Sequence, residues 1–315
     1  MLKRLLCAKI SSIMKILIIG SGNVGAHIGY LMLFTDYVDE VLIYDVQRDI
    51  LNGKVLDLSH AGGVLKKDIK FTVVEDLNEV EADIVVITAG MPRKEGMTRF
   101  DLLEVNIKIL DQVINNINKR LIEESIFIMV SNPVDVLTYY FYNKTGIDRN
   151  RLIGMAGALD LGRFRYYLSK NIGSKITELE PQVIGSHSKD MFCIFESTSI
   201  EEKIEISKKE TKEAGATIVS YYKGGSAYFA PAAGVKVLLD TILGNRKEVV
   251  SSVAILDGEY GYNDIAFGVP VEISSRGIDR IVELDLDSSQ KEELDGSIKG
   301  IKESLSFLKD KEILI

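Results

Sequence analysis

Three residues in the second half of the chain have the types and spacing needed to transfer a proton beside a bound anion. Asp160 and Arg163 are three residues apart, so they share one face of a helix. His187 lies in the sequence GSHS between two apolar runs, a setting that favours an exposed imidazole. On spacing alone, a surface ion pair and a structural histidine explain these residues as well.

A polar loop adds two more cations. Residues 91–99 (MPRKEGMTR) follow the apolar run 83–88 and contain Arg93 and Arg99. Loops at the carboxyl ends of parallel strands carry the ligand contacts in α/β folds. A solvated loop is the alternative explanation.

A glycine-rich stretch near the start predicts a cofactor site. The apolar run 16–19 leads into Gly20, Gly22 and Gly25, which have the G-x-G-x-x-G spacing of dinucleotide-binding folds. These glycines suit a tight turn, a close approach of the backbone to a pyrophosphate, and close packing of the next helix, respectively. That helix, about residues 23–34, would direct its N–H groups and its positive dipole end at the phosphates.

An acidic residue follows at the distance that such a fold requires. Asp45 ends the apolar run 41–44 and lies twenty residues after Gly25, where a carboxylate binds the adenine ribose hydroxyls. The alternative is a glycine-rich turn in another α/β protein, with Asp45 as a helix cap. The combination of strand, glycines, helix and acid favours the dinucleotide site.

The elements that would position these residues alternate between strands and helices in the first half. Strands are expected at 16–19, 41–44, 71–74, 83–88 and 125–130, and helices at about 23–34, 48–59, 103–117 and 133–145. This β-α-β alternation predicts a Rossmann-type, doubly wound parallel sheet in an α/β domain over residues 14–150.

Residues 151–315 have the mixed pattern of a C-terminal α+β domain that would bind the substrate. Helices are expected at about 159–171, 208–222 and 232–243, and strands at 181–184, 191–195 and 249–256. A last helix is expected to begin at a capping box of Ser289 and Glu292. Residues 1–13 are basic and lack an acid, which predicts a disordered extension, with an organelle presequence as the alternative.

The composition excludes several classes of protein. The 315 residues are 46% apolar and 27% charged, as in a globular protein of about two domains. A net charge of −8 argues against nucleic acid as a partner, and no apolar run approaches the roughly 20 residues of a membrane span. Cys7 and Cys193 exclude a disulfide framework and a cysteine-ligated zinc site. We expect no metal and a cytoplasmic location.

Over residues 14–308 the chain resembles the lactate and malate dehydrogenase family. The matching stretches, in the order of the family, are IIGSGNVG, VLIYDV, ITAGMPRKEGMTRFDLLEVN, VSNPVD, GALDLGRFR, IGSHSKDMF, KGGSAYFAPA and GEYGYNDIAFGVP. The resemblance implies reversible, NAD-dependent oxidation of a 2-hydroxy acid by a homodimer or homotetramer.

The resemblance also implies roles for single residues. It makes His187 the proton acceptor and donor, Asp160 the residue that orients it, and Arg163 the residue that holds the C1 carboxylate of the substrate. Further substrate contacts are implied for Arg99, on a mobile loop, and for Asn132 and Ser226. Cofactor contacts are implied for Gly20, Gly22, Asn23, Val24, Gly25, Asp45, Thr88, Ala89, Gly90, Asn106, Val130 and Asn132.

Arg93 takes the position that contacts the far end of the substrate in this family. Members that act on lactate commonly have Gln there, and members that act on malate have Arg. Pyruvate would leave this cation enclosed and unpaired, which costs about 2–5 kcal/mol, so the resemblance implies malate and oxaloacetate. A lactate or other 2-hydroxy-acid dehydrogenase is the nearest alternative. A nicotinamide-binding sensor without turnover is a second, although a sensor would not need the cluster of arginines around His187.

Three residues depart from the family pattern. Ser188 and Lys189 stand where the family usually has Gly and Asp after the histidine, and Glu95 replaces a loop proline. At Ser188 any conformation that only glycine allows would be lost.

Overall fold

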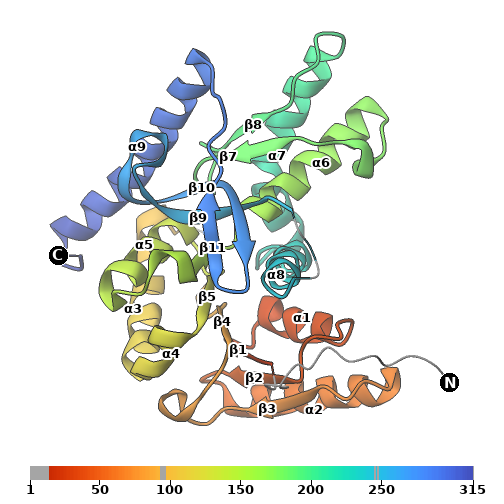
Figure 1. Ribbon diagram of the computed structural model, residues 1–315, viewed down its shortest axis with the longest axis vertical. Helices are drawn as coiled ribbons and strands as arrows, with labels where there is room; N and C mark the ends of the chain where they lie inside the picture. Colours follow the sequence, from red (N-terminus) through yellow and green to blue (C-terminus); the bar gives the residue numbers. More distant parts are fainter. Residues whose placement is uncertain (1–13, 93–96, 245, 247, 315) are drawn as a thin grey trace.

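A single nine-stranded sheet forms the centre of the molecule, in the order β11-β10-β9-β6-β5-β4-β1-β2-β3 (Figure 1). The computed structural model describes residues 14–92, 97–244, 246 and 248–314. The strands of this sheet are β1 (Lys15–Ile19), β2 (Glu40–Tyr44), β3 (Lys70–Val73), β4 (Ile84–Ile87), β5 (Ile126–Met129), β6 (Leu152–Gly154), β9 (Val250–Asp257), β10 (Asn263–Ser274) and β11 (Gly277–Ile281). A separate ribbon pairs β7 (Gln182–Ile184) with β8 (Phe192–Ile194).

The six strands from β3 to β6 are parallel, in the order expected of a dinucleotide-binding fold. Every residue of β4 and β5 is buried, because helices cover both faces of this part of the sheet. The carboxyl ends of β1, β2, β4 and β5 therefore open into loops along one edge of the sheet. The predicted doubly wound sheet is confirmed.

Helices pack on the two faces, with α3, α4 and α5 to one side of the parallel strands and α1 and α8 to the other (Figure 1). The helices are α1 (Asn23–Met32), α2 (Arg48–Leu65), α3 (Arg99–Asn116), α4 (Lys119–Glu124), α5 (Val134–Thr145), α6 (Gly157–Ile172), α7 (Glu201–Tyr222), α8 (Phe229–Ile242) and α9 (Ser288–Asp310).

The C-terminal part extends the same sheet instead of forming a separate one. β9 lies antiparallel to β6, where Gly154 faces Val253. A Cβ on Gly154 would lie 2.5 Å from the Cβ of Val253, so only glycine allows this junction. β6 follows residue 150 yet belongs to the parallel strands, and the division into domains at that point stays a prediction.

Several predicted element boundaries are wrong. The last helix is capped by Asp287 with Gln290, two residues before the predicted Ser289 and Glu292. Helix α7 begins at Glu201, seven residues before the predicted start, because the polar first turns show little apolar periodicity. No strand was predicted at β6, β10 or β11, and no helix was predicted at α4. Residues 1–13 lie outside the part of the chain that the structure describes.

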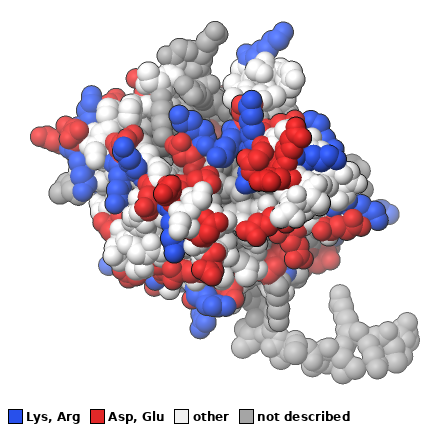
Figure 2. Space-filling view, turned by 90° about the horizontal axis from the view of Figure 1, so that it is seen from above, with Lys and Arg blue, Asp and Glu red and all other residues white. Residues whose placement is uncertain are grey.

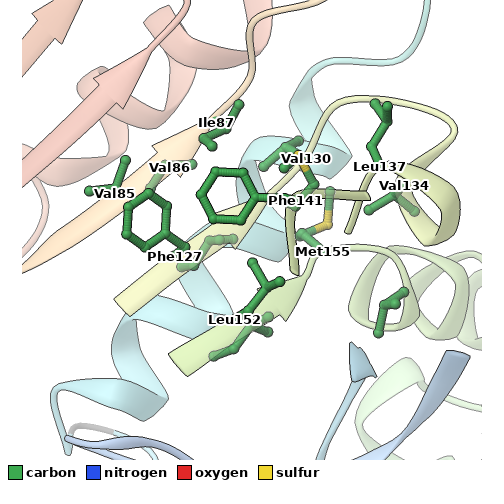
Figure 3. Packing of buried hydrophobic residues seen from close by; sticks show 14 of the residues in the cluster. Val85, Val86, Ile87, Phe127, Val130, Val134, Leu137, Phe141, Leu152 and Met155 are labelled. Atoms are coloured by element: carbon green, nitrogen blue, oxygen red, sulfur yellow. The ribbon is translucent and has the colours of Figure 1, made fainter. Parts of the chain in front are cut away.

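The main hydrophobic core runs along the nine-stranded sheet, and Figure 3 shows the part where α5 packs on β5 and β6. The rings of Phe127 and Phe141 are 5.0 Å apart there, next to Leu152 and Met155. Met155 comes just before α6, so the core holds the start of that helix against the sheet. A smaller core under β7 and β8 contains Leu161 and Phe164 of α6.

The packing at Gly25 gives a first prediction. A Cβ on Gly25 would lie 2.0 Å from the carbonyl oxygen of Gly20, and neither backbone can move freely. We expect Gly25→Ala to lower the free energy of unfolding by about 1–3 kcal/mol, measured by urea denaturation. Gly53→Ala is the matched control, since nothing lies within 4 Å of its Cβ position in α2, and it should be neutral or stabilising by up to about 1 kcal/mol. Equal effects of the two substitutions would contradict this explanation.

Candidate active site

The glycine-rich turn after β1 leaves the N-terminus of α1 open. Gly20 has a φ of +107°, and its N–H donates to the Tyr44 carbonyl (2.8 Å). Gly22 is the N-cap of α1, no side chain caps this helix, and no described atom lies within 4 Å of the Cβ position of Gly22. Asn23 and Val24 form the first turn. These backbone N–H groups and the open glycine face fit a pyrophosphate.

Asp45 is held rigidly beside this turn. Its carboxylate accepts hydrogen bonds from the N–H of Ser21 (2.6 Å), the hydroxyl of Ser21 (2.8 Å) and the N–H of Gln47 (2.9 Å). Burial raises the pKa of Asp45, but these hydrogen bonds and the nearby Lys54 outweigh it and lower the pKa. A fixed carboxylate at the end of β2 fits a ribose diol. Ser21 and Lys54 were not predicted as site residues, since neither belongs to the glycine pattern.

Loops after β4 and β5 form the rest of the cofactor side. Thr88 donates its hydroxyl hydrogen to the carbonyl of Gly20 (2.8 Å). Asn106 of α3 is buried, accepts from the N–H of Met91 (2.7 Å) and donates to the carbonyl of Asn132 (2.7 Å). Asn106 therefore ties the two loops together and positions Asn132. Ala89 and Gly90 lie in the first of these loops, and Val130 directly follows β5 at the start of the second.

His187 and Asp160, which both lie in the second half of the chain, form a hydrogen-bonded pair. The Nδ1 atom of His187 lies 2.7 Å from Oδ2 of Asp160, which is 3% exposed. Because a carboxylate only accepts, Nδ1 carries the hydrogen and Nε2 is the ring nitrogen left for a ligand. Asp160 is in the first turn of α6, and His187 follows β7. The structure brings together two residues that are 27 positions apart.

Arg163 shares the same carboxylate. Its guanidinium donates to Oδ1 of Asp160 (3.1 Å), as the i, i+3 spacing on one helix predicts. Helix α7 approaches here through Gly215, whose Cβ position lies 3.8 Å from the guanidinium nitrogens of Arg163. A larger side chain at Gly215 would crowd the guanidinium.

A second buried carboxylate holds the backbone of His187. Asp135, at the start of α5, is 2% exposed and accepts from the N–H of His187 (2.9 Å). Burial and the positive charge of Arg163 lower the pKa of His187. The charge of Asp160, its hydrogen bond to the ring and the charge of Asp135 raise the pKa. The raising effects are larger, so the pKa of His187 is raised overall. Asp135 was not predicted as a site residue, although it lies in the VSNPVD stretch.

The turn that carries His187 is braced by hydroxyl groups. The N–H of Ser186 donates to the hydroxyl of Ser297 in α9 (2.9 Å), and the hydroxyls of Ser186 and Ser188 are 2.8 Å apart. Ser188 is not among the described residues with positive φ. The conformation that only glycine allows is therefore not required at Ser188, and its hydroxyl supports the turn instead.

A cavity of about 1250 Å³ opens in front of these groups. His187, Arg163, Asn132 and Ser226 all line it, so the structure brings four of the predicted substrate residues to one place. Arg93 lies outside the described residues. Arg99 begins α3, and its side chain is outside the described part.

Two family models match almost the whole chain. Residues 14–154 match the NAD binding domain of lactate/malate dehydrogenase, and residues 157–312 match its alpha/beta C-terminal domain. The chain belongs to the lactate/malate dehydrogenase family. The predicted family and the prediction of NAD as the cofactor are confirmed.

The family members similar to this chain include curated malate dehydrogenases. The Helicobacter hepaticus enzyme is 38% identical, with 95% of this chain and 99% of the relative covered. The Myxococcus xanthus enzyme is 34% identical, with 94% and 98% covered.

Solved structures of both branches of the family resemble this structure. Malate dehydrogenase from Cryptosporidium parvum has a TM-score of 0.88 at 33% identity, covering 94% of this chain and 99% of that chain. Lactate dehydrogenase from the same organism, solved with lactic acid and β-nicotinamide adenine dinucleotide, has a TM-score of 0.88 at 29% identity, covering 95% and 99%.

The pair of His187 and Asp160 gives a second prediction. We expect an NMR titration to give His187 a pKa above its ordinary value of about 6.5, so that its proton is kept to higher pH. Asp160→Asn should lower this pKa, because an amide does not stabilise the imidazolium charge. Asp57→Asn, an exposed change in α2, is the control and should leave the His187 titration unmoved. An unchanged His187 pKa in Asp160→Asn would refute the assignment.

Proposed function

We propose that this protein is an NAD-dependent malate dehydrogenase, which interconverts (S)-malate and oxaloacetate. One observation carries the proposal: the imidazole of His187 and the guanidinium of Arg163 bind opposite oxygens of Asp160 and line the same cavity. A proton-transferring group and a carboxylate-binding group therefore lie side by side. A protein that only sensed the cofactor would not need this arrangement.

In the proposed mechanism His187 moves the proton. In malate oxidation, Nε2 of neutral His187 takes the proton of the C2 hydroxyl, and Asp160 stabilises the imidazolium that forms. In oxaloacetate reduction, the protonated ring returns that proton to the carbonyl oxygen. The raised pKa of His187 keeps the ring protonated to higher pH than an ordinary imidazole, and the protonated ring is the form that oxaloacetate reduction requires.

The remaining residues bind and orient the two reactants. Arg163 would hold the C1 carboxylate with two parallel hydrogen bonds, and Arg99 would polarise the reacting carbonyl. Asn132 and Ser226 would contact the substrate from opposite loops of the cavity. The cofactor would lie along Gly20, Gly22, Gly25 and Asp45, with further contacts from Asn23, Val24, Thr88, Ala89, Gly90, Asn106, Val130 and Asn132. NAD, when bound, supplies the hydride acceptor.

The choice of malate over lactate rests on Arg93 and on the names of the relatives. A cation at that position would pair with the second carboxylate of oxaloacetate, which pyruvate lacks. The curated relatives described above are named malate dehydrogenases. Oxidation of lactate is the second candidate activity, because a lactate dehydrogenase from Cryptosporidium parvum has a similar structure.

The partners we propose are a small-molecule substrate and further copies of the chain, in a homodimer or homotetramer. An apolar cavity of about 630 Å³ lies between α6, α7 and α8, and Tyr166, Tyr221 and Val249 around it are exposed. A second copy would cover these side chains, which a lone chain leaves in water. Arg163 also lines this cavity, so assembly would support the substrate site from behind.

Other partners have no support in the described structure. On the face shown in Figure 2, Lys and Arg side chains are interspersed with Asp and Glu. The net charge of −8 is the reason to expect no nucleic-acid partner. Among the described residues no helix is long and apolar enough to cross a membrane. A cytoplasmic location stays a prediction, resting on the two cysteines.

Arg93 gives the test of the substrate. Wild-type protein should reduce oxaloacetate with NADH at a much higher kcat/KM than pyruvate, since a site built to pair a polar group rejects an analogue without it by about 10⁴-fold. Arg93→Gln should lower kcat/KM for oxaloacetate and raise it for pyruvate, because the unpaired cation is removed. NADH oxidation followed at 340 nm measures both.

Lys94→Gln is the matched control for Arg93→Gln, since it removes a neighbouring charge from the same loop. It should leave the ratio of the two kcat/KM values nearly unchanged. If Arg93→Gln moves this ratio by less than about threefold, which is under about 1 kcal/mol, Arg93 is not the discriminating residue. If wild type prefers pyruvate, the lactate alternative replaces the malate proposal.

The assembly is tested by molar mass. Light scattering after size exclusion should give two or four times the mass of one chain. Tyr221→Asp should shift the protein toward the monomer, because it places a charge on the covered surface. Ile206→Asp, at an exposed position of α7 that does not line this cavity, should not. A wild-type monomer at micromolar concentration would exclude the proposed assembly.

A further inference from the structure

The turn after His187 presents a lysine to the substrate cavity. The N–H of Ser188 donates to the carbonyl of Ser186 (2.7 Å), the N–H of Asp190 donates to the hydroxyl of Ser188 (3.0 Å), and the N–H of Met191 donates to the carbonyl of Ser188 (3.2 Å). These bonds leave Lys189 at the tip of a braced turn. Its side chain is exposed and lines the cavity.

Helix α7 provides two more lysines on the wall of the same cavity. Lys212 lies within the helix, and Lys223 is its C-cap, with a φ of +52°. Lys212 has a loose contact with Glu293 (3.9 Å). Within the described part of the chain, neither Lys189 nor Lys223 has an ion pair. The charges of Lys189 and Lys223 are therefore available to a ligand, and Lys212 is held only loosely by Glu293.

No described residue that lines this cavity is an Asp or a Glu. The chain as a whole is acidic, with a net charge of −8, so a general excess of basic residues does not explain a cationic cavity. Arg163, the inner cation, is already paired with Asp160. The positive charge is thus concentrated on the lysines outside the inner site.

The cavity also has room beyond the reacting groups. Its volume of about 1250 Å³ exceeds the roughly 300–1,000 Å³ of most small-molecule sites, and a four-carbon acid is a small ligand. A four-carbon acid at Arg163 would therefore leave part of this volume for the nicotinamide ring and for a second anionic group.

We propose that Lys189, Lys212 and Lys223 form an outer anion subsite that binds a carboxylate group at the mouth of the cavity. The carboxylate belongs either to the incoming dicarboxylate substrate or to a separate small polycarboxylate. The first source rests on the proposed function, and the second does not. Like-signed side chains around a cavity raise the local concentration of a counter-ion and its association rate, and salt screens this effect.

The first test uses enzyme with bound NADH and compares two double variants. Lys189→Gln with Lys223→Gln removes two charges from the subsite. Lys203→Gln with Lys209→Gln removes two exposed charges from α7 that do not line the cavity. The first pair should lower kcat/KM for oxaloacetate about fivefold at 20 mM ionic strength and less than about twofold at 300 mM. The second pair should stay within about twofold of wild type at both.

The second test needs no turnover. Titration calorimetry measures the binding of tricarballylate, an unreactive tricarboxylate, to wild type and to both double variants. A loss of affinity of about fivefold in the Lys189 and Lys223 variant alone identifies a separate polycarboxylate as a ligand. Unchanged thermal melting and NADH fluorescence titrations show that each variant is folded.

The outcomes separate this proposal from the proposed function. A salt-dependent loss of kcat/KM supports the substrate as the source, and a loss of tricarballylate affinity supports the separate anion. The subsite is overturned if the loss of kcat/KM is equal at both ionic strengths and the affinity for tricarballylate is unchanged. It is also overturned if the two double variants behave alike in both tests. If wild type does not reduce oxaloacetate, the proposed function fails, and the calorimetry still decides whether the subsite exists.

Discussion

The carboxylate of Asp160 is the group on which the site depends. It is almost completely buried and binds both His187 and Arg163, one through each oxygen. A buried charge without partners is very unfavourable, so the imidazole and the guanidinium are held at fixed positions relative to each other. The same carboxylate keeps His187 protonated more readily, against the effect of burial. One residue thus sets both the geometry and the proton affinity of the proposed site.

The two halves of the chain are joined through the same turn. Asp135 from the first half holds the backbone of His187, and Ser297 from the last helix holds that of Ser186. The antiparallel strands extend the parallel sheet at Gly154, so no gap separates the part that would bind the cofactor from the part that would bind the substrate. A hydride donor and a proton donor need such a shared frame, because small errors in their positions cost rate.

Much of the fold followed from local patterns. The apolar runs that became β1, β4 and β5 are buried on both faces, and continuous apolar runs predict that setting. Strand β10 was missed because Gly268 and Pro270 interrupt its apolar run. Strand β11 and the start of α7 were missed because charged residues leave little apolar periodicity there. The capping box at Ser289 was placed two residues late, because Asp287 and Gln290 satisfy the helix N-terminus equally well by residue type.

By itself, the sequence determined the glycine turn with its acid at the end of β2, the shared helix face of Asp160 and Arg163, and the family. These depend on spacing along a strand or a helix, where the backbone alone sets which residues are neighbours. Only the tertiary structure decided that Asp135 binds the backbone of His187, that Ser188 braces a turn where glycine is usual, and that Lys189 shares a cavity with two lysines of α7. The distances in these contacts depend on how the whole chain packs or on the shape of an irregular turn. The regular spacing of residues along a helix or strand does not predict such distances.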